Sequence, residues 1–252
     1  RHPSFLSLPP NTSASQKITF PFSENLRGFL RVKAKAPWKV IGSPLRACIL
    51  PPGELSDSRF GINHAYPWPH LLCLAKKAGI LWVRDWSLKW KDVEPERGRF
   101  DFSQTDLQIN RVLAQGMKVL GLLPFPSSPW SSSAPPEKRK GTGYVARRAV
   151  VAFAPKNIED FKRYVERTVQ HYRGRIEWFQ VFNEPLFTSY SLPRSEGYDG
   201  TDYARYVKAF REAAKGVKVL GGIGYLRKGQ IMKDFEAFFA SNGLDSVDAV
   251  DI

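Results

Sequence analysis

The sequence predicts an α/β protein in which helices alternate with the strands of a parallel sheet. From residue 54 onward, short apolar runs alternate with amphipathic stretches whose apolar residues recur with the period of a helix. The runs are apolar at successive positions, which is typical of parallel strands buried on both faces. The composition, with 42% hydrophobic and 25% charged residues, is that of an ordinary globular protein.

Residues 1–53 differ from the rest of the chain. Residues 1–15 are rich in Pro, Ser, Thr and Asn, which indicates a loosely attached leader. Short apolar runs broken by Pro and Gly follow at residues 18–20, 29–32, 38–41 and 47–50. These runs predict a few antiparallel strands. The tripeptide Pro51-Pro52-Gly53 ends the segment, so we place a domain boundary after residue 53.

The region from residue 54 to residue 252 contains six predicted strands joined by five helices. The strands are the apolar runs at residues 60–63, 80–83, 117–123, 176–182, 217–223 and 247–252. The helices cover residues 70–78, 106–114, 157–172, 202–214 and 231–240. Pro69 starts the first helix, and Gly79 and Gly116 end the first two. In the third helix, Ile158, Phe161, Val165 and Val169 recur at helical spacing.

Two architectures have such a parallel sheet, the closed (β/α)₈ barrel and the open doubly wound sheet. An open sheet usually binds a nucleotide at a glycine-rich loop after a strand. Residues 141–146 match the dinucleotide fingerprint as a string, but they follow a loop of Pro, Ser and Lys instead of a strand. The sequence therefore favours a barrel. Six strands are counted where a barrel needs eight, so we expect a chain that holds about six βα units.

The charge of the chain favours an anionic partner. Thirty-eight Lys and Arg against 24 Asp and Glu give a net charge of +14, which attracts nucleic acid, anionic lipid or acidic polysaccharide. No recognition helix, zinc spacing or ribonucleoprotein motif is present, so we expect no nucleic-acid partner. No apolar run is long enough to cross a membrane. The sequence leaves the oligomeric state open. The N-terminus lacks a signal-peptide pattern, as a mature exported protein also would, and we expect a secreted or periplasmic location.

The sharpest chemical feature is Asn183-Glu184-Pro185, directly after the fourth predicted barrel strand. Polar side chains at the carboxyl end of a parallel strand lie at the mouth of a barrel, where active sites of this fold are built. Pro185 disfavours a helix at Glu184, so we expect an extended residue whose side chain crosses the mouth. Burial among aromatic residues would raise the pKa of this carboxyl, as a general acid requires. The alternative is a strand-ending turn with a solvated glutamate.

Other polar and aromatic residues follow the predicted strands at the same end. Arg84 can orient a carboxylate and keep it ionised, or form an ordinary salt bridge. Asn63 and His64 can contact sugar hydroxyls or lie in a solvated loop. Aromatic side chains that can stack on sugar rings or simply pack in the protein are Trp86, Trp130 and Tyr225. The basic loop at residues 137–148 is either solvated or a subsite for uronate or sulfate groups.

Together, two motifs resemble the retaining glycoside hydrolases of clan A. One is the tract from Trp90 to Asp106, with the pattern Trp-x₃-Glu-Pro-x₂-Gly-x-Phe-x-Phe-x₃-Asp, and the other is Asn183-Glu184-Pro185. The resemblance covers residues 60–252. Within the clan the chain is most similar to family 39 and its relatives, and families 5, 10 and 42 share parts of the pattern. Enzymes of this kind often carry an accessory β-sandwich, of which residues 1–53 are a candidate part.

The resemblance implies a (β/α)₈ barrel that cleaves glycosidic bonds with retention and needs no cofactor or metal. The acid/base glutamate of the clan falls on Glu184, the asparagine that binds the sugar 2-hydroxyl on Asn183, and the strand-two arginine on Arg84. The nucleophile of the clan ends the seventh strand, which we expect beyond residue 252.

No other acid is nominated as the nucleophile. Glu196, Glu236 and Asp251 do not end a seventh strand. We expect Glu94 and Glu96 at the surface. The resulting hypothesis is a retaining glycosidase that acts on a poly- or oligosaccharide, an anionic one in view of the charge. The alternative is a carbohydrate-binding pseudoenzyme or an inactive fragment.

Overall fold

The computed structural model describes residues 28–32, 45–49, 59–63, 67–187, 189–222 and 230–251. The chain divides into two compact units, Arg1–Gly53 and Glu54–Ile252. In the first unit, β1 (Gly28–Val32) and β2 (Leu45–Ile49) form an antiparallel ladder in which Gly28 faces Ile49. The apolar runs at residues 29–32 and 47–50 thus fall on antiparallel strands, as predicted, with residue 50 outside the described residues. Those at residues 18–20 and 38–41 lie outside the described residues.

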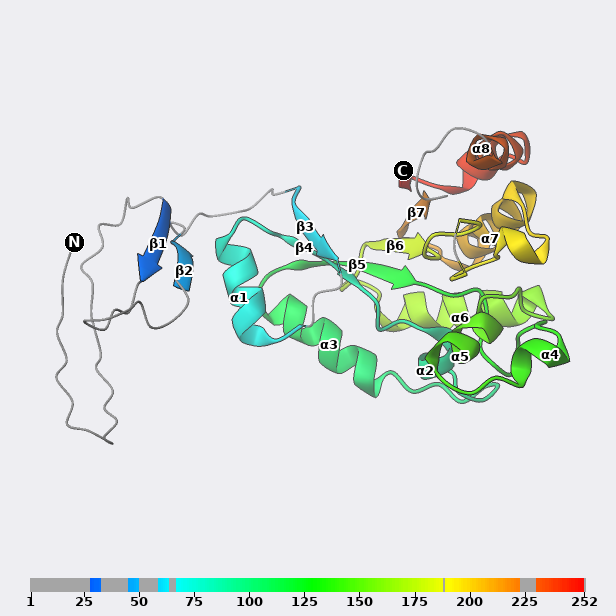
Figure 1. Cartoon of the computed structure of the whole chain (residues 1–252), viewed down its shortest axis with the longest axis horizontal. Helices are drawn as coiled ribbons and strands as arrows, with labels where there is room; N and C mark the ends of the chain where they lie inside the picture. Colours follow the sequence, from blue (N-terminus) through cyan, green and yellow to red (C-terminus); the bar gives the residue numbers. More distant parts are fainter. Residues whose placement is uncertain are drawn as a thin grey trace, which may run out of the picture. The chain divides into compact units, whose positions relative to one another are not determined.

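The second unit contains a six-stranded parallel sheet whose order follows the chain (Figure 1). Each neighbouring pair is parallel, and no strand is inserted between two others. A doubly wound sheet reverses its strand order at a switch point, whereas a barrel adds each strand beside the last. The sheet is therefore part of a (β/α)₈ barrel, as predicted. Its strands are β3 (Gly61–Asn63), β4 (Trp82–Asp85), β5 (Lys118–Leu123), β6 (Trp178–Val181), β7 (Lys218–Gly222) and β8 (Ala249–Asp251).

Five long helices connect these strands, and each matches a predicted helix to within three residues at either end. They are α1 (Pro69–Lys77), α3 (Ser103–Ala114), α6 (Ile158–His171), α7 (Gly200–Ala213) and α8 (Gln230–Ala240). The start of α7 is fixed by a capping box between Asp199 and Asp202. This helix therefore begins two residues earlier than predicted. Within the described residues no helix combines the length and the apolar character needed to cross a bilayer.

Short helices were not predicted from the sequence. α2 (Trp90–Val93) follows β4, and α4 (Pro136–Arg139) and α5 (Tyr144–Val151) follow β5. Single turns lie at Arg194–Glu196 and Gly243–Ser246. Helices of four residues are too short to show a period. Of the segment assigned to a basic loop, residues 137–139 and 144–148 are helical, and Figure 1 shows α4 and α5 at the arrowhead end of β5.

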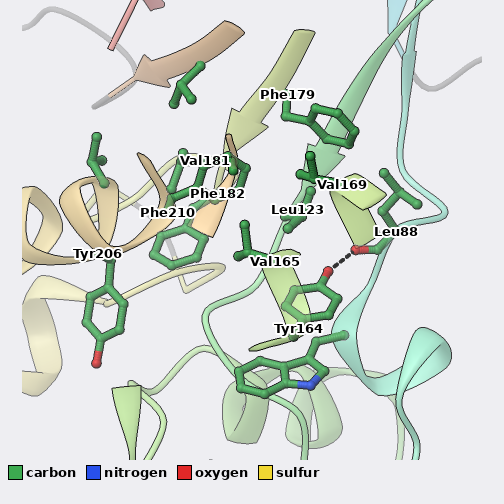
Figure 2. Close-up of a cluster of buried hydrophobic side chains, with 14 of the residues drawn as sticks. Leu88, Leu123, Tyr164, Val165, Val169, Phe179, Val181, Phe182, Tyr206 and Phe210 are labelled. Atoms are coloured by element: carbon green, nitrogen blue, oxygen red, sulfur yellow. Dashed lines mark hydrogen bonds between the residues drawn. The ribbon is translucent and has the colours of Figure 1, made fainter. Parts of the chain in front are cut away.

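The core lies between the sheet and the helices and is centred on α6. Phe161, Val165 and Val169, three of the four residues that predicted this helix, are buried. Figure 2 shows Val165 and Val169 beside strand residues such as Leu123 and Val181. Tyr164 stacks on Trp90 with ring centroids 4.9 Å apart, and its hydroxyl donates to the Leu88 carbonyl at 2.5 Å (Figure 2). The loop after β4 is thereby fastened to α6.

Gly200, the first residue of α7, is expected to tolerate no side chain. A Cβ there would collide with the backbone carbonyl oxygen of Asp234 and lie 2.9 Å from the backbone nitrogen of Phe238, both in α8. Backbone atoms cannot move aside as a flexible side chain can. We expect Gly200→Ala to lower the free energy of unfolding by about 2–3 kcal/mol, as overpacked sites do. Urea denaturation measures this free energy. Thr201 is an exposed neighbour, and an equal loss of unfolding free energy in Thr201→Ala would contradict this explanation.

Candidate active site

Arg84 is the centre of a polar network at the carboxyl ends of the strands. Its Nε donates to Gln180 Oε1 at 2.6 Å, its Nη2 to Asn183 Oδ1 at 3.0 Å and its Nη1 to Asn63 Oδ1 at 3.2 Å. Asn63 is the register partner of Arg84 in the β3–β4 ladder, which places the two residues side by side. One guanidinium therefore connects β3, β4 and β6 through three amide groups.

Two nearby carboxylates affect the pKa of Arg84. Burial lowers the pKa of the Arg84 guanidinium, and the carboxylates of Asp251 and Glu184 act in the opposite direction. Asp251 Oδ2 also accepts a hydrogen bond from Gln180 Nε2 at 2.9 Å. The network thus extends to β8, and it places positive charge close to Glu184.

Asn183 is held in a defined orientation next to Glu184. The residue is buried, its backbone nitrogen donates to the Pro124 carbonyl at 3.2 Å, and its Oδ1 accepts from Arg84. The Oδ1 already accepts from Arg84, and the two Nδ2 donors can bind another group. No described residue accepts a hydrogen bond from this Nδ2.

The conformation of Glu184 differs from the prediction. Its φ is 45°, in the left-handed region, so the expected extended backbone is wrong. A following proline disfavours the right-handed helical region but does not by itself select the extended one. Phe182 and Leu186 also have positive φ, so three of the five residues after β6 lie in the left-handed region. Non-glycine residues in this region are uncommon and cluster at functional sites.

The surroundings of Glu184 also differ from the prediction. We expected aromatic residues to bury its carboxyl, but the residue is exposed. Its backbone is nevertheless fixed, because the flanking loop is tied to neighbouring elements. Phe182 N donates to the Leu123 carbonyl at 3.0 Å, and Leu186 N donates to the Ser191 carbonyl at 3.0 Å. The glutamate therefore stands on an ordered turn at the end of β6.

Trp86 joins the Arg84 network, whereas Trp130 does not. Trp86 Nε1 donates to Asn63 Oδ1 at 2.8 Å, and the Arg84 guanidinium carbon lies 5.1 Å from the Trp86 ring centroid. Trp130 packs edge-on against Trp90, and its Nε1 donates to the Glu94 carbonyl at 2.9 Å. Its described contacts are thus with the loop after β4. Tyr225 and His64, the other candidates, lie outside the described residues.

Glu94 was expected at the surface, and this is wrong, because its side chain is fully buried. Its Oε2 accepts from Trp90 Nε1 at 2.6 Å, and its Oε1 accepts from Gly98 N at 2.7 Å and Arg163 Nη2 at 2.9 Å. Gly98 has a φ of 84°, which favours glycine. Through Glu94, the tract from Trp90 to Gly98 therefore links the loop after β4 to α6 by hydrogen bonds.

The remaining acids lie outside the Arg84 network. Glu96 is exposed, as expected, and pairs with Arg99 at 3.4 Å. Glu196 pairs with Lys138 at 2.5 Å, and Glu236 is exposed on α8. Gln180 and Asp251 were not predicted as members of the site. A glutamine inside an otherwise apolar strand, and an aspartate at a strand end like Arg84, were signals that could have identified both.

A cavity of about 390 Å³ is lined in part by Asn63 and Arg84 of this network. It is lined by Arg59, Gly61, Ile62, Asn63, Trp82, Arg84, Leu120, Trp178 and Leu220. Most of these residues belong to strands, and Glu184 is absent from the lining. We therefore place the candidate site at the strand ends around Arg84, Asn183 and Glu184, and not in this cavity.

Parallel strands in chain order, with polar side chains gathered at their carboxyl ends, define the class of (β/α)₈-barrel proteins that carry their site at this end. Residues 73–218 match the family model "Glycosyl hydrolase family 10". The matched segment is more than half of the chain. The chain belongs to this family. The resemblance to the glycoside hydrolases of clan A is thereby confirmed.

Individual relatives are more distant. The chain is 28% identical over 149 residues to "Beta-galactosidase 13" of Arabidopsis thaliana, a match that covers 58% of this chain and 16% of that protein. Among solved structures, a family 39 glycoside hydrolase of Bacteroides cellulosilyticus WH2 matches with a TM-score of 0.63 and 16% identity, over 89% of this chain and 44% of that one. A psychrophilic family 10 endo-β-1,4-xylanase matches with a TM-score of 0.53 and 14% identity, over 77% and 63%. The chain thus spans under two thirds of each relative, and these structures support the fold alone.

Proposed function

We propose that the chain provides the acid/base part of a retaining glycosidase, with Glu184 as the general acid and base. The observation that supports this most strongly is the hydrogen bond from Arg84 to Asn183, because it orients the residue next to Glu184. The Nδ2 of Asn183 is then the donor that binds the 2-hydroxyl of the sugar. Arg84 is a positioning residue, because it acts through Asn183.

The proposed reaction needs two carboxyl groups. Glu184 gives its proton to the departing glycosidic oxygen while a carboxylate, roughly 5–5.5 Å away, forms a bond to the anomeric carbon. Glu184 then removes a proton from the water that releases the sugar. Asp251 ends the sixth strand of the sheet and is held by Gln180, so we do not assign it as the nucleophile. We propose that the nucleophile lies beyond residue 252 in the whole protein.

The stereochemistry of the product tests this function. The whole protein is incubated with xylo-oligosaccharides and with aryl β-galactosides, the substrate types that the names of the relatives indicate. Proton NMR during the first turnovers is expected to show a product with the anomeric configuration of the substrate. A product that appears first with the inverted configuration would disprove the assignment of a retaining mechanism.

One observation favours a second candidate, a protein that binds sugar without cleaving it. Glu184 is exposed in the described structure, whereas a general acid is usually kept protonated by burial. Calorimetric titration with the same oligosaccharides separates the two candidates. Saturable binding without hydrolysis of any of these substrates would favour the binding protein and reject the glycosidase.

A further inference from the structure

A second cation lies beyond Trp86, on the side of the loop that follows Glu184. Tyr190, in this loop, approaches the Trp86 ring edge-on with centroids 6.1 Å apart. The guanidinium carbon of Arg148, from α5, lies over the Tyr190 ring at 4.4 Å. The Arg148 side chain is therefore separated from Trp86 by a single aromatic ring.

The position of Arg148 is fixed by its neighbours. Its Nη2 donates to Ser189 Oγ at 2.8 Å, and the Tyr144 ring lies 5.7 Å from its guanidinium carbon. The helix that carries it is joined to the loop after β6, because Leu192 N donates to the Ala152 carbonyl at 2.8 Å. A charged fork held in this way loses little conformational entropy when it binds an anion.

The positive charge around Arg148 is largely unneutralised. The segment at residues 136–148 contains five Lys and Arg and one acid, Glu137. Within the described parts of the chain, Lys138 alone of these five cations has a carboxylate partner, Glu196. Arg139 donates to three backbone carbonyls instead. No described carboxylate lies within ion-pairing distance of Arg148, so a partner that supplies an anion would complete this surface.

We propose that Arg148, placed by Tyr190, is a subsite for an acidic group on the sugar chain, either the carboxylate of a uronate or a sulfate ester. The proposal rests on the proposed function, because it names the substrate class of that same site. Both anions present oxygen pairs that a guanidinium binds through two parallel hydrogen bonds. The aromatic rings of Trp86 and Tyr190 suit the C–H faces of the sugar rings between this anion and Glu184.

The alternative is that Arg148 only holds the loop after β6 in place. The two roles differ in one respect, because a structural arginine affects acidic and neutral sugars alike. Arg147 provides a matched control, since it carries the same charge on the same helix, is exposed, and has no described contact with Tyr190. Its replacement reports the effect of the net charge alone.

The experiment measures binding in the whole protein with Glu184 replaced by glutamine, so that its result does not depend on turnover. The probes are glucuronoxylo-oligosaccharides and the same compounds after carboxyl reduction, and sulfated galacto-oligosaccharides and their desulfated forms. At least one acidic probe is expected to bind more tightly than its neutral counterpart. Arg148→Gln is expected to weaken the binding of that acidic probe about 10-fold or more, which is the scale of a charge-assisted bidentate contact. It is expected to change the affinity for the neutral counterpart less than about twofold.

Several results would overturn the proposal. If neither acidic probe binds more tightly than its neutral counterpart, the subsite does not exist. Equal losses in Arg148→Gln and Arg147→Gln would assign the effect to net charge, and an equal loss for the neutral probe would assign it to loop structure. If thermal melting shows that Arg148→Gln is unfolded, Arg148→Lys decides, since it keeps the charge but loses the fork. Hydrolysis by the protein with Glu184 intact is measured separately and reports on the proposed function alone.

Discussion

Replacing Glu184 by glutamine is expected to lower kcat roughly 10²–10⁴-fold on substrates with poor leaving groups, the usual contribution of a general acid. Alkyl glycosides and oligosaccharides need a proton at the departing oxygen. Dinitrophenyl glycosides do not, and on these the first step is expected to keep most of its rate. KM for oligosaccharides should change little, because glutamine preserves the size and polarity of the side chain.

The matched control is Glu177→Gln, which removes an exposed carboxylate that precedes β6 at the opposite end of the same strand. Glu184→Ala with added azide provides a second test, since azide can attack the glycosyl-enzyme without a general base. A glycosyl azide of retained configuration is the expected product. Equal losses in the rate of the first step, measured as kcat/KM, for good and poor leaving groups would contradict the proposed role of Glu184 as the acid.

Removing the buried carboxylate of Glu94 is expected to cost about 3 kcal/mol of unfolding free energy in Glu94→Ala, as breaking a buried ion pair does. The substitution leaves the Trp90 indole, the Gly98 backbone nitrogen and one donor of Arg163 without their acceptor. Arg163 keeps Asp160 at 2.7 Å, so its charge is not left entirely unpaired. The loss is measured by chemical denaturation.

Glu96→Ala is the control for this prediction, because Glu96 lies two residues away and is exposed. We expect it to change the unfolding free energy by less than about 0.5 kcal/mol, as most surface substitutions do. The unfolding free energy of Glu94→Gln should lie between those of the two alanine variants, since the amide oxygen of glutamine can still accept from Trp90 or Gly98. Equal unfolding free energies of the two alanine variants would show that the hydrogen bonds of Glu94 do not stabilise the fold.

The periodicity of the sequence was sufficient to predict the sheet and its long helices. The parallel strands are mostly apolar at successive positions and each connecting helix has one apolar face, so both signals are local. The short α2 and α4 carry no such signal. The cap of α7 depends on Asp199, three residues before the predicted start of that helix. Element boundaries were therefore less accurate than element types.

The candidate site was predicted only in part, because strand ends can be located from sequence and contacts cannot. Arg84, Asn63 and Asn183 were found since each follows or ends a predicted strand, and the structure joins them by hydrogen bonds. Glu94 was misjudged because its partner Arg163 is 69 residues away. The backbone of Glu184 was misjudged because a proline restricts one region of φ and ψ without choosing between the others.

The span of the Arg84 network along the sequence has a consequence for how the protein is made. Its members run from Asn63 in the first strand of the sheet to Asp251 in the last. On the ribosome, the amino-terminal half of this cluster is complete long before its final member emerges. Contacts this distant in sequence form slowly, since a long loop must close first. The Arg84 network would thus be among the last contacts of this sheet to form, and it would stay incomplete until residue 251 has left the ribosome.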